Sequence, residues 1–110
     1  MNINICKDYT DTPGGRYISQ GDFSGEDFRN KLLMPKYIEA VKNGEKLKID
    51  LDGGYGYGSS FLEEAFGGLI RELKDNYKQA LEIIELKSDD EPSLIDDITK
   101  YIKEEIKKKK

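Results

Sequence analysis

Residues 46–77 read KLKIDLDGGYGYGSSFLEEAFGGLIRELKDNY, and this stretch decides the fold. Apolar and polar side chains alternate up to Leu51, which is the period of a strand with one buried face. Four glycines follow, so the backbone is free to turn before the paired Ser59 and Ser60. From Leu62 the apolar residues recur at the spacing of one helical face. The stretch therefore predicts a strand, a glycine-rich loop and a helix, with two hydroxyl groups at the junction.

The bulk composition predicts a small globular domain. The chain has 110 residues, which is the size of one domain, so we expect a single domain over residues 1–110. Its net charge of −4 argues against general nucleic-acid binding, which needs a basic face. Residues 103–110 form a basic end, which we interpret as a solvated helix end rather than a membrane or nucleic-acid patch. No stretch approaches membrane-spanning length and no leader segment is evident, so we expect a cytoplasmic protein.

The chain lacks the residue type that most often acts in general acid–base catalysis. It contains no histidine, which removes the usual activating base for a serine or cysteine nucleophile and the commonest transition-metal ligand. Its single cysteine, Cys6, lies in an alternating segment where we expect a small core residue of a strand. We therefore expect no enzyme activity, no catalytic residue, no metal and no cofactor.

The other predicted elements flank the central stretch. Ser24 is a good N-cap for a helix that ends at Gly44, and Pro35 divides this helix or kinks it. Pro92 suits the first turn of the last helix. Further strands are expected at residues 2–6, at residues 16–18 as the return of an antiparallel hairpin, and at residues 81–86. The order β-β-α-β-α-β-α predicts an α/β fold with a mixed four-stranded sheet and helices packed mainly on one face.

The junction serines allow a structural and a functional interpretation. Ser60 and Glu63 have the spacing of a capping box, although the cap could also fall at Ser59 or Gly58. Alternatively, a serine at a helix N-terminus presents its hydroxyl where the helix dipole favours an anion, so either serine could accept a phosphoryl group.

The glycine-rich loop differs from the common nucleotide-binding motifs. It lacks the lysine of a P-loop, and its glycines do not match G-x-G-x-x-G. An anionic ligand or nucleotide held by the loop amides, with Arg16 or Tyr57, remains the alternative function. Tyr55 and Tyr57 could equally stack on a partner surface.

Two further patterns lie in the same stretch. The carboxylates of Asp50, Asp52, Glu63 and Glu64 could form an acid/base or metal site, or could simply be structural charges. Adjacent glycines at residues 67–68 each cost about 1 kcal/mol inside a helix. They predict close packing of this helix against the sheet or a neighbouring element.

The motifs TPGGR, SGEDFR, DLDG and GSSFLEEAFGGL resemble small bacterial STAS-like domains of uncharacterised function. The resemblance covers residues 12–71 and extends to the STAS anti-sigma factor antagonists, in which paired serines follow a strand. It implies a STAS-like fold, and Ser60 matches the phosphoacceptor of the antagonists. Gly58 stands where the antagonists have an aspartate, and Phe61 where they have a glycine.

The resemblance implies a non-enzymatic regulatory module that binds another protein, an ATP-binding kinase-like or anti-sigma-type regulator. No nucleic acid or membrane partner is expected, and the chain is expected to be a monomer or weak dimer. The candidate phosphoacceptors are Ser60 and Ser59. The candidate partner- or ligand-binding residues are Asp52, Gly54, Tyr55, Gly56, Tyr57, Gly58, Phe61, Glu64 and Arg16.

Overall fold

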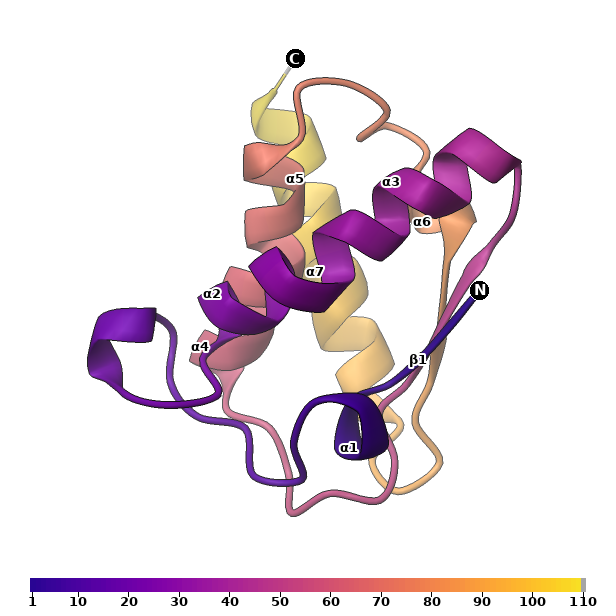
Figure 1. Cartoon of the computed structure of the whole chain (residues 1–110). Helices are drawn as coiled ribbons and strands as arrows, with labels where there is room; N and C mark the ends of the chain where they lie inside the picture. The colour runs from indigo at the N-terminus through magenta and orange to yellow at the C-terminus, as the bar shows by residue number, and fades with distance from the viewer. Residues whose placement is uncertain (110) are drawn as a thin grey trace.

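A sheet of three parallel strands forms one layer of the molecule, which the computed structural model describes over residues 1–109 (Figure 1). The strands are β1 (Asn2–Asn4), β2 (Leu47–Asp50) and β3 (Ile84–Lys87), with β2 in the centre. Ile3 pairs in register with Ile49, which pairs with Leu86, so these three side chains share one face. Ile3 and Ile49 are buried in the core. The central strand predicted from the alternating pattern is therefore confirmed.

The predicted sheet of four strands in mixed orientation is wrong, because residues 16–18 do not form a strand. The chain instead makes a short 3-10 turn, η1 (Ile18–Gln20). The side-chain Oε1 of Gln20 accepts hydrogen bonds from the N–H groups of Arg16 (3.1 Å) and Tyr17 (3.0 Å). These bonds satisfy main-chain groups that strand pairing would otherwise use. Without this hairpin, every strand of the sheet runs in the same direction.

The first strand is shorter than predicted, since α1 (Ile5–Asp8) follows β1 directly. Asn4 caps this helical turn, and its side chain accepts a hydrogen bond from a main-chain N–H at 3.0 Å. Cys6 therefore lies in a helical turn and is only half-buried. Its Sγ donates to the main-chain oxygen of Gly53 at 3.2 Å. The prediction that Cys6 is a core residue of a strand is wrong.

One continuous helix connects β1 with β2. Its segments are α2 (Gly25–Phe28), η2 (Arg29–Leu33) and α3 (Met34–Asn43). Ser24 caps its start by accepting the N–H of Asp27 at 3.0 Å, and Gly44 ends it with a φ of 67°, as predicted. The segment η2 is a π-helical turn just before Pro35. Because proline lacks an N–H and its ring crowds the preceding turn, the wider π turn lets the helix continue past it.

The helix after the glycine-rich loop is also continuous. Its segments are α4 (Ser59–Leu62), η3 (Glu63–Gly67) and α5 (Gly68–Glu72). It ends at Glu72, although the apolar spacing that starts at Leu62 continues to Tyr77, because Leu73 adopts an extended backbone with a ψ of 130°. A further helical turn, α6 (Ala80–Ile83), occupies the first half of the predicted strand at residues 81–86. Only the second half of that strand prediction is correct, since β3 begins at Ile84.

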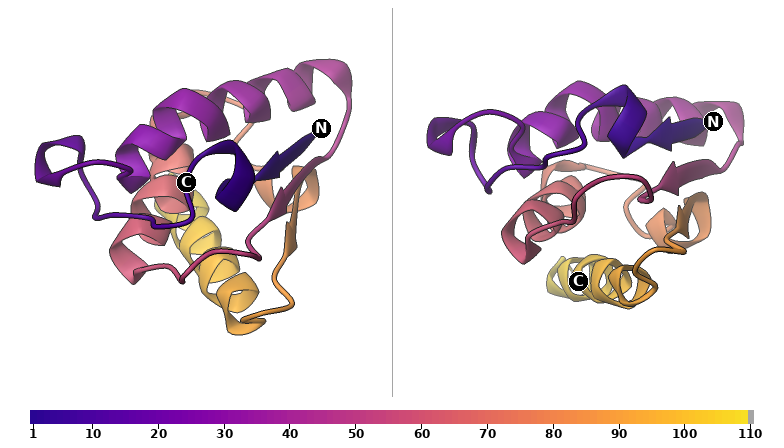
Figure 2. Two further views of the ribbon diagram at one scale, coloured as in Figure 1. Left: turned by 60° about the horizontal axis from the view of Figure 1, so that its bottom comes forward. Right: turned by 90° about the horizontal axis from the view of Figure 1, so that it is seen from below.

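The last helix, α7 (Ser93–Lys108), packs against η3, α5 and α6. Figure 2 shows the helices gathered on one side of the sheet. The opposite side is an open hollow lined by all three strands, including the polar residues Asn4, Asp50 and Lys87. Within residues 1–109, no helix combines the length and the apolar character that crossing a membrane requires.

Candidate functional site

The helix that begins at Ser59 has no side-chain cap. Its N-cap residue is Gly58, with an extended backbone at φ −76° and ψ 149°, so Ser59 and Ser60 occupy the first and second helical positions. Both serines are exposed. The third position belongs to Phe61, which has no polar group to complete a capping box. The predicted capping box of Ser60 with Glu63 is therefore wrong, and the alternative cap at Gly58 is confirmed.

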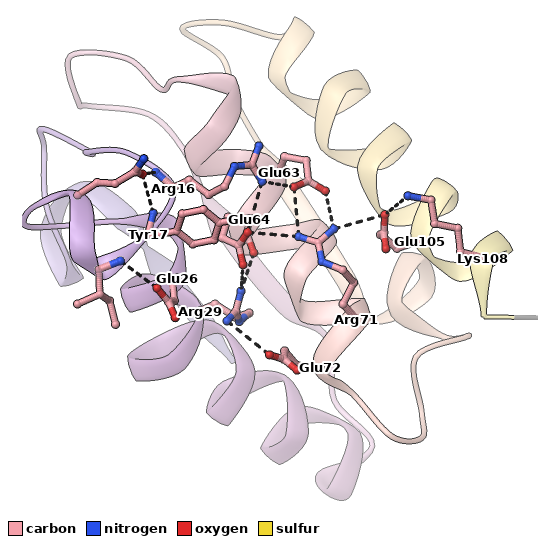
Figure 3. A network of polar contacts seen from close by, with 12 residues as sticks. Arg16, Tyr17, Glu26, Arg29, Glu63, Glu64, Arg71, Glu72, Glu105 and Lys108 are labelled. Carbon is pink, nitrogen blue, oxygen red and sulfur yellow. Dashed lines mark hydrogen bonds and ion pairs between the residues drawn. The ribbon is translucent and has the colours of Figure 1, made fainter.

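Glu63 binds two arginines instead of capping the helix (Figure 3). Nη1 of Arg16 donates to its Oε1, and Nη1 of Arg71 donates to its Oε2 at 2.7 Å. These bonds, first from Arg71 and then from Arg16, lower the pKa of the Glu63 carboxyl group below its ordinary value. Glu63 thus ties the start of this helix to the loop that follows the TPGG turn.

Glu64 forms a buried ion pair with Arg29. Nη1 of Arg29 lies 2.5 Å from Oε2 of Glu64 and 3.0 Å from its main-chain oxygen. The other carboxylate oxygen of Glu64 lies 3.3 Å from Arg16 and 3.4 Å from Arg71. Only 4% of Arg29 and 8% of Glu64 are exposed, so the pair lies inside the molecule. Its role is to join two helices rather than to meet a partner directly.

Two glycines within the helix of α4, η3 and α5 lie against charged side chains of the network. A side chain at Gly68 would collide with Nη1 of Arg29, and one at Gly67 would collide with the carboxylate of Glu63. Gly25, at the start of α2, lies in the same way against the main-chain oxygen of Phe61. The close packing predicted from Gly67 and Gly68 is confirmed at Gly68, whose neighbour is the helix that carries Arg29. Gly67 lies instead against the carboxylate of Glu63 in its own helix.

The network extends across α7. Nη1 of Arg71 lies 3.4 Å from Oε2 of Glu105, which Lys108 approaches at 2.9 Å (Figure 3). Glu105 is 5% exposed, so α7 buries a carboxylate against α5, the helical segment that carries Arg71. Ion pairs thereby join the loop at Arg16, both long connecting helices and α7.

The glycine-rich loop carries an exposed aromatic side chain. Gly53 and Gly56 have φ values of 94° and 115°, which favour glycine. The N–H of Tyr55 donates to the main-chain oxygen of Asp11 at 3.0 Å, and Gly54 lies close to the same carbonyl group. The side chain of Tyr55 is 85% exposed. A main-chain hydrogen bond therefore holds the loop, while the ring of Tyr55 faces solvent.

Tyr57 and Phe61 turn inward from the same region. The Tyr57 ring is half-buried and lies 5.9 Å from the Phe61 ring. Burial raises the pKa of the Tyr57 hydroxyl above its ordinary value. Phe61 is completely buried, and its ring stacks on that of Phe28 at 5.8 Å. Phe61 contributes to the core, so its side chain does not face a partner.

Asp52 fastens the glycine-rich loop to the turn before α7. Its carboxylate accepts the N–H groups of Asp90 (2.9 Å) and Asp89 (3.1 Å) and the ammonium group of Lys87 (2.7 Å). In return, the carboxylate of Asp90 accepts the N–H of Gly53 at 3.1 Å. The bond from Asp90, then those from Lys87 and Asp89, lower the pKa of Asp52 from 3.8 to about 2. Asp52 therefore has a structural role.

The four carboxylates considered for an acid/base or metal site fall into two pairs, and each pair has its own cationic partners. Asp50 and Asp52 each form an ion pair with Lys87, whereas Glu63 and Glu64 form ion pairs with arginines. Among residues 1–109, no group of three or more His, Cys, Asp or Glu side chains could hold a metal ion.

Sequence reasoning missed Arg29, Arg71 and Glu105 as members of this network. The one available signal was the glycine pair at residues 67–68, which indicates a close approach but does not identify the neighbour. Arg29 and Glu64 lie in two π-helical turns, η2 and η3, and such turns occur often at functional sites.

A comparison with protein families finds one match, described as a STAS-like domain of unknown function (DUF4325), over residues 24–92. The matched range contains Ser59, Ser60 and the glycine-rich loop but not the TPGGR motif. Comparisons with curated proteins and with solved structures find no significant match.

Proposed function

The chain belongs to the family of STAS-like domains of unknown function, and from that membership we propose that it is a non-enzymatic regulatory module. It binds a protein partner through the junction of residues 53–66. Phosphorylation of Ser60, or of Ser59, changes that binding. The partner is an ATP-binding kinase-like or anti-sigma-type protein, by similarity to the STAS antagonists.

The proposal rests on two exposed serines at a helix start that has no side-chain cap. Ser59 and Ser60 are exposed at the first two positions of a helix that continues to Glu72. The first N–H groups of a helix have no partner within it, and the helix dipole favours a negative charge there. A phosphoryl group adds about −1.5 to −2 charges at pH 7. It would therefore be accommodated at this position without breaking a structural hydrogen bond.

The surroundings of the serines favour a change at the surface rather than in the fold. Glu63 and Glu64 hold the first turns of the helix through Arg16, Arg29 and Arg71. A rigid support of this kind presents the serines in one orientation, which reduces the entropy that binding costs.

The exposed loop supplies the rest of the proposed contact surface. Tyr55 offers an aromatic ring of the type that is enriched at protein interfaces. Gly56 and Gly58 have open space beside them and allow a partner to approach the backbone closely, whereas Gly54 holds the loop against Asp11. Asp52, Phe61 and Glu64 support this surface from within, and the side chain of Arg16, which is 29% exposed, lies at its border.

The proposal is tested in two steps. Intact-mass analysis of the chain purified from its native cells should detect a phosphoryl group that is lost in Ser60→Ala or Ser59→Ala. Affinity purification with Ser60→Ala and Ser60→Asp should then recover partner proteins in different amounts. Ser19→Asp, on the exposed turn η1, is the matched control and should leave recovery unchanged. Unmodified protein, together with equal recovery by both Ser60 variants, would contradict the switch.

The alternative is an anionic ligand or nucleotide bound at the glycine-rich loop. The free amides at the start of α4 favour it, because helix N-termini bind anions. However, Arg16 is already paired with Glu63 and Glu64, and Asp90 and Glu91 line the hollow beside the loop. A thermal-shift panel of nucleotides and inorganic phosphate separates the two functions, since a ligand that binds only the folded state raises its melting temperature.

A further inference from the structure

An apolar groove of about 430 Å³ lies between α3 and the segment that follows α5. Tyr37 and Leu73 are buried beneath it, and Tyr37 donates a hydrogen bond to the main-chain oxygen of Asn76 across it at 2.5 Å. Ile38 stands on the groove with 50% of its surface exposed. The remaining apolar lining residues are Met34 and Val41. This surface lies along α3, away from the start of α4 (Figure 1).

The rim of the groove carries two charges of each sign. Lys42 and Lys74 are the cations, and Glu72 and Asp75 are the anions. Within residues 1–109, Lys42, Lys74 and Asp75 form no ion pair, and the only ion-pair contact of Glu72 is at 3.9 Å from Arg29. The rim charges are therefore available to a molecule that covers the groove.

We propose that the groove is the interface of a two-fold symmetric dimer of this chain. In such a dimer the same patch faces itself, so the patch must be complementary to its own charges. A rim with equal numbers of lysines and carboxylates meets this condition, because each lysine can face a carboxylate of the second copy. A uniformly acidic or basic partner would instead leave two rim charges facing charges of their own sign. Ile38 of each copy enters the groove of the other.

The size of the patch implies a weak dimer. A stable interface buries about 1,600 Å² in total, whereas only one large apolar side chain, Ile38, is exposed at this groove. Association should therefore appear only as the protein concentration rises. Because the groove is separate from the exposed serines, the dimer does not depend on the proposed phosphorylation and leaves that site open.

Sedimentation equilibrium over a range of concentrations tests the dimer. The mass of the native chain should rise from 12.6 kDa toward twice that value, and Ile38→Asp should stay at 12.6 kDa. Ile18→Asp makes the same substitution at an isoleucine of similar exposure, 52% against 50%, on the turn η1 and should dimerise like the native chain. A native mass of 12.6 kDa at every concentration overturns the proposal and leaves the groove to another protein or a small apolar ligand.

Reversing the rim charges tests whether this groove is the dimer interface. Lys42→Glu/Lys74→Glu and Glu72→Lys/Asp75→Lys should each remain monomeric, and an equal mixture of the two should regain the dimer mass. Lys100→Glu/Lys103→Glu, on exposed positions of α7, removes the same charge elsewhere and should dimerise normally. Circular dichroism confirms that each variant is folded. Dimers in both rim variants alone, or a mixture no heavier than its components, would exclude this groove as the interface.

Discussion

Arg29 donates to Glu64 twice, to the side-chain carboxylate at 2.5 Å and to the main-chain oxygen at 3.0 Å. The two residues lie 35 positions apart in the chain. Each belongs to a π-helical turn, η2 or η3, within a long connecting helix. The pair therefore fixes the distance between the two helices and supports the helix start that presents Ser59 and Ser60.

Breaking this pair should destabilise the fold strongly. Arg29→Met leaves Glu64 buried with only its longer contacts to Arg16 and Arg71, and loss of one partner of a buried pair costs about 3–5 kcal/mol. We expect the lower end of this range in urea unfolding. Arg29→Met/Glu64→Met should recover part of the loss. As a control, Lys31→Met breaks the ion pair between Lys31 and Asp27 at the surface of the same helix. This change should cost less than about 1 kcal/mol.

Gly68→Ala should destabilise the protein although alanine is the better helix former. The helix propensity of alanine favours it by about 1 kcal/mol, but the added methyl group would collide with Nη1 of Arg29. Thermal unfolding should therefore show a lower melting temperature than in the native protein. In an Arg29→Met background the same substitution should cost less, and an equal cost in both backgrounds would contradict the steric explanation.

The two serines at helix starts should respond differently to alanine. Ser24 is buried and accepts the N–H of Asp27 at 3.0 Å, so Ser24→Ala should lower the free energy of unfolding by about 1 kcal/mol. Ser60 lies at the second helical position, past the Gly58 cap, and Ser60→Ala should change stability by less than about 0.5 kcal/mol. Urea unfolding of the two variants in parallel measures the difference. An equal loss in the free energy of unfolding for the two variants would indicate that Ser60 does cap its helix.

Asp52 should make stability depend on pH in the acid range. Hydrogen bonds lower its pKa in the folded state from 3.8 to about 2. A lowered carboxyl pKa stabilises the fold above the unfolded value, and this contribution is lost as the pH falls from about 4 to about 2. Asp52→Asn should flatten that part of the stability profile. The pKa itself can be followed by NMR titration, and Lys87→Met should raise it.

Several elements could be predicted because their cause lies within a few residues. The strand at β2 follows from alternating side chains, and the helix limits at Ser24 and Gly44 follow from cap chemistry. Of the glycine pair at residues 67–68, Gly68 correctly predicted a close approach to another helix. The prediction failed at residues 16–18, where the side chain of Gln20 binds the backbone in place of a neighbouring strand.

The sequence by itself determined the central strand, the glycine-rich loop and the helix behind the paired serines, because local periodicity and glycine content specify them. Only the tertiary structure decided what Glu63 does. Its spacing from Ser60 suits a cap, but Arg16, 47 positions away, is brought within bonding distance. A charged arginine bonds a carboxylate more strongly than a main-chain amide does. Neither serine therefore caps the helix in a box with Glu63, and both stay exposed. No local pattern could establish this result.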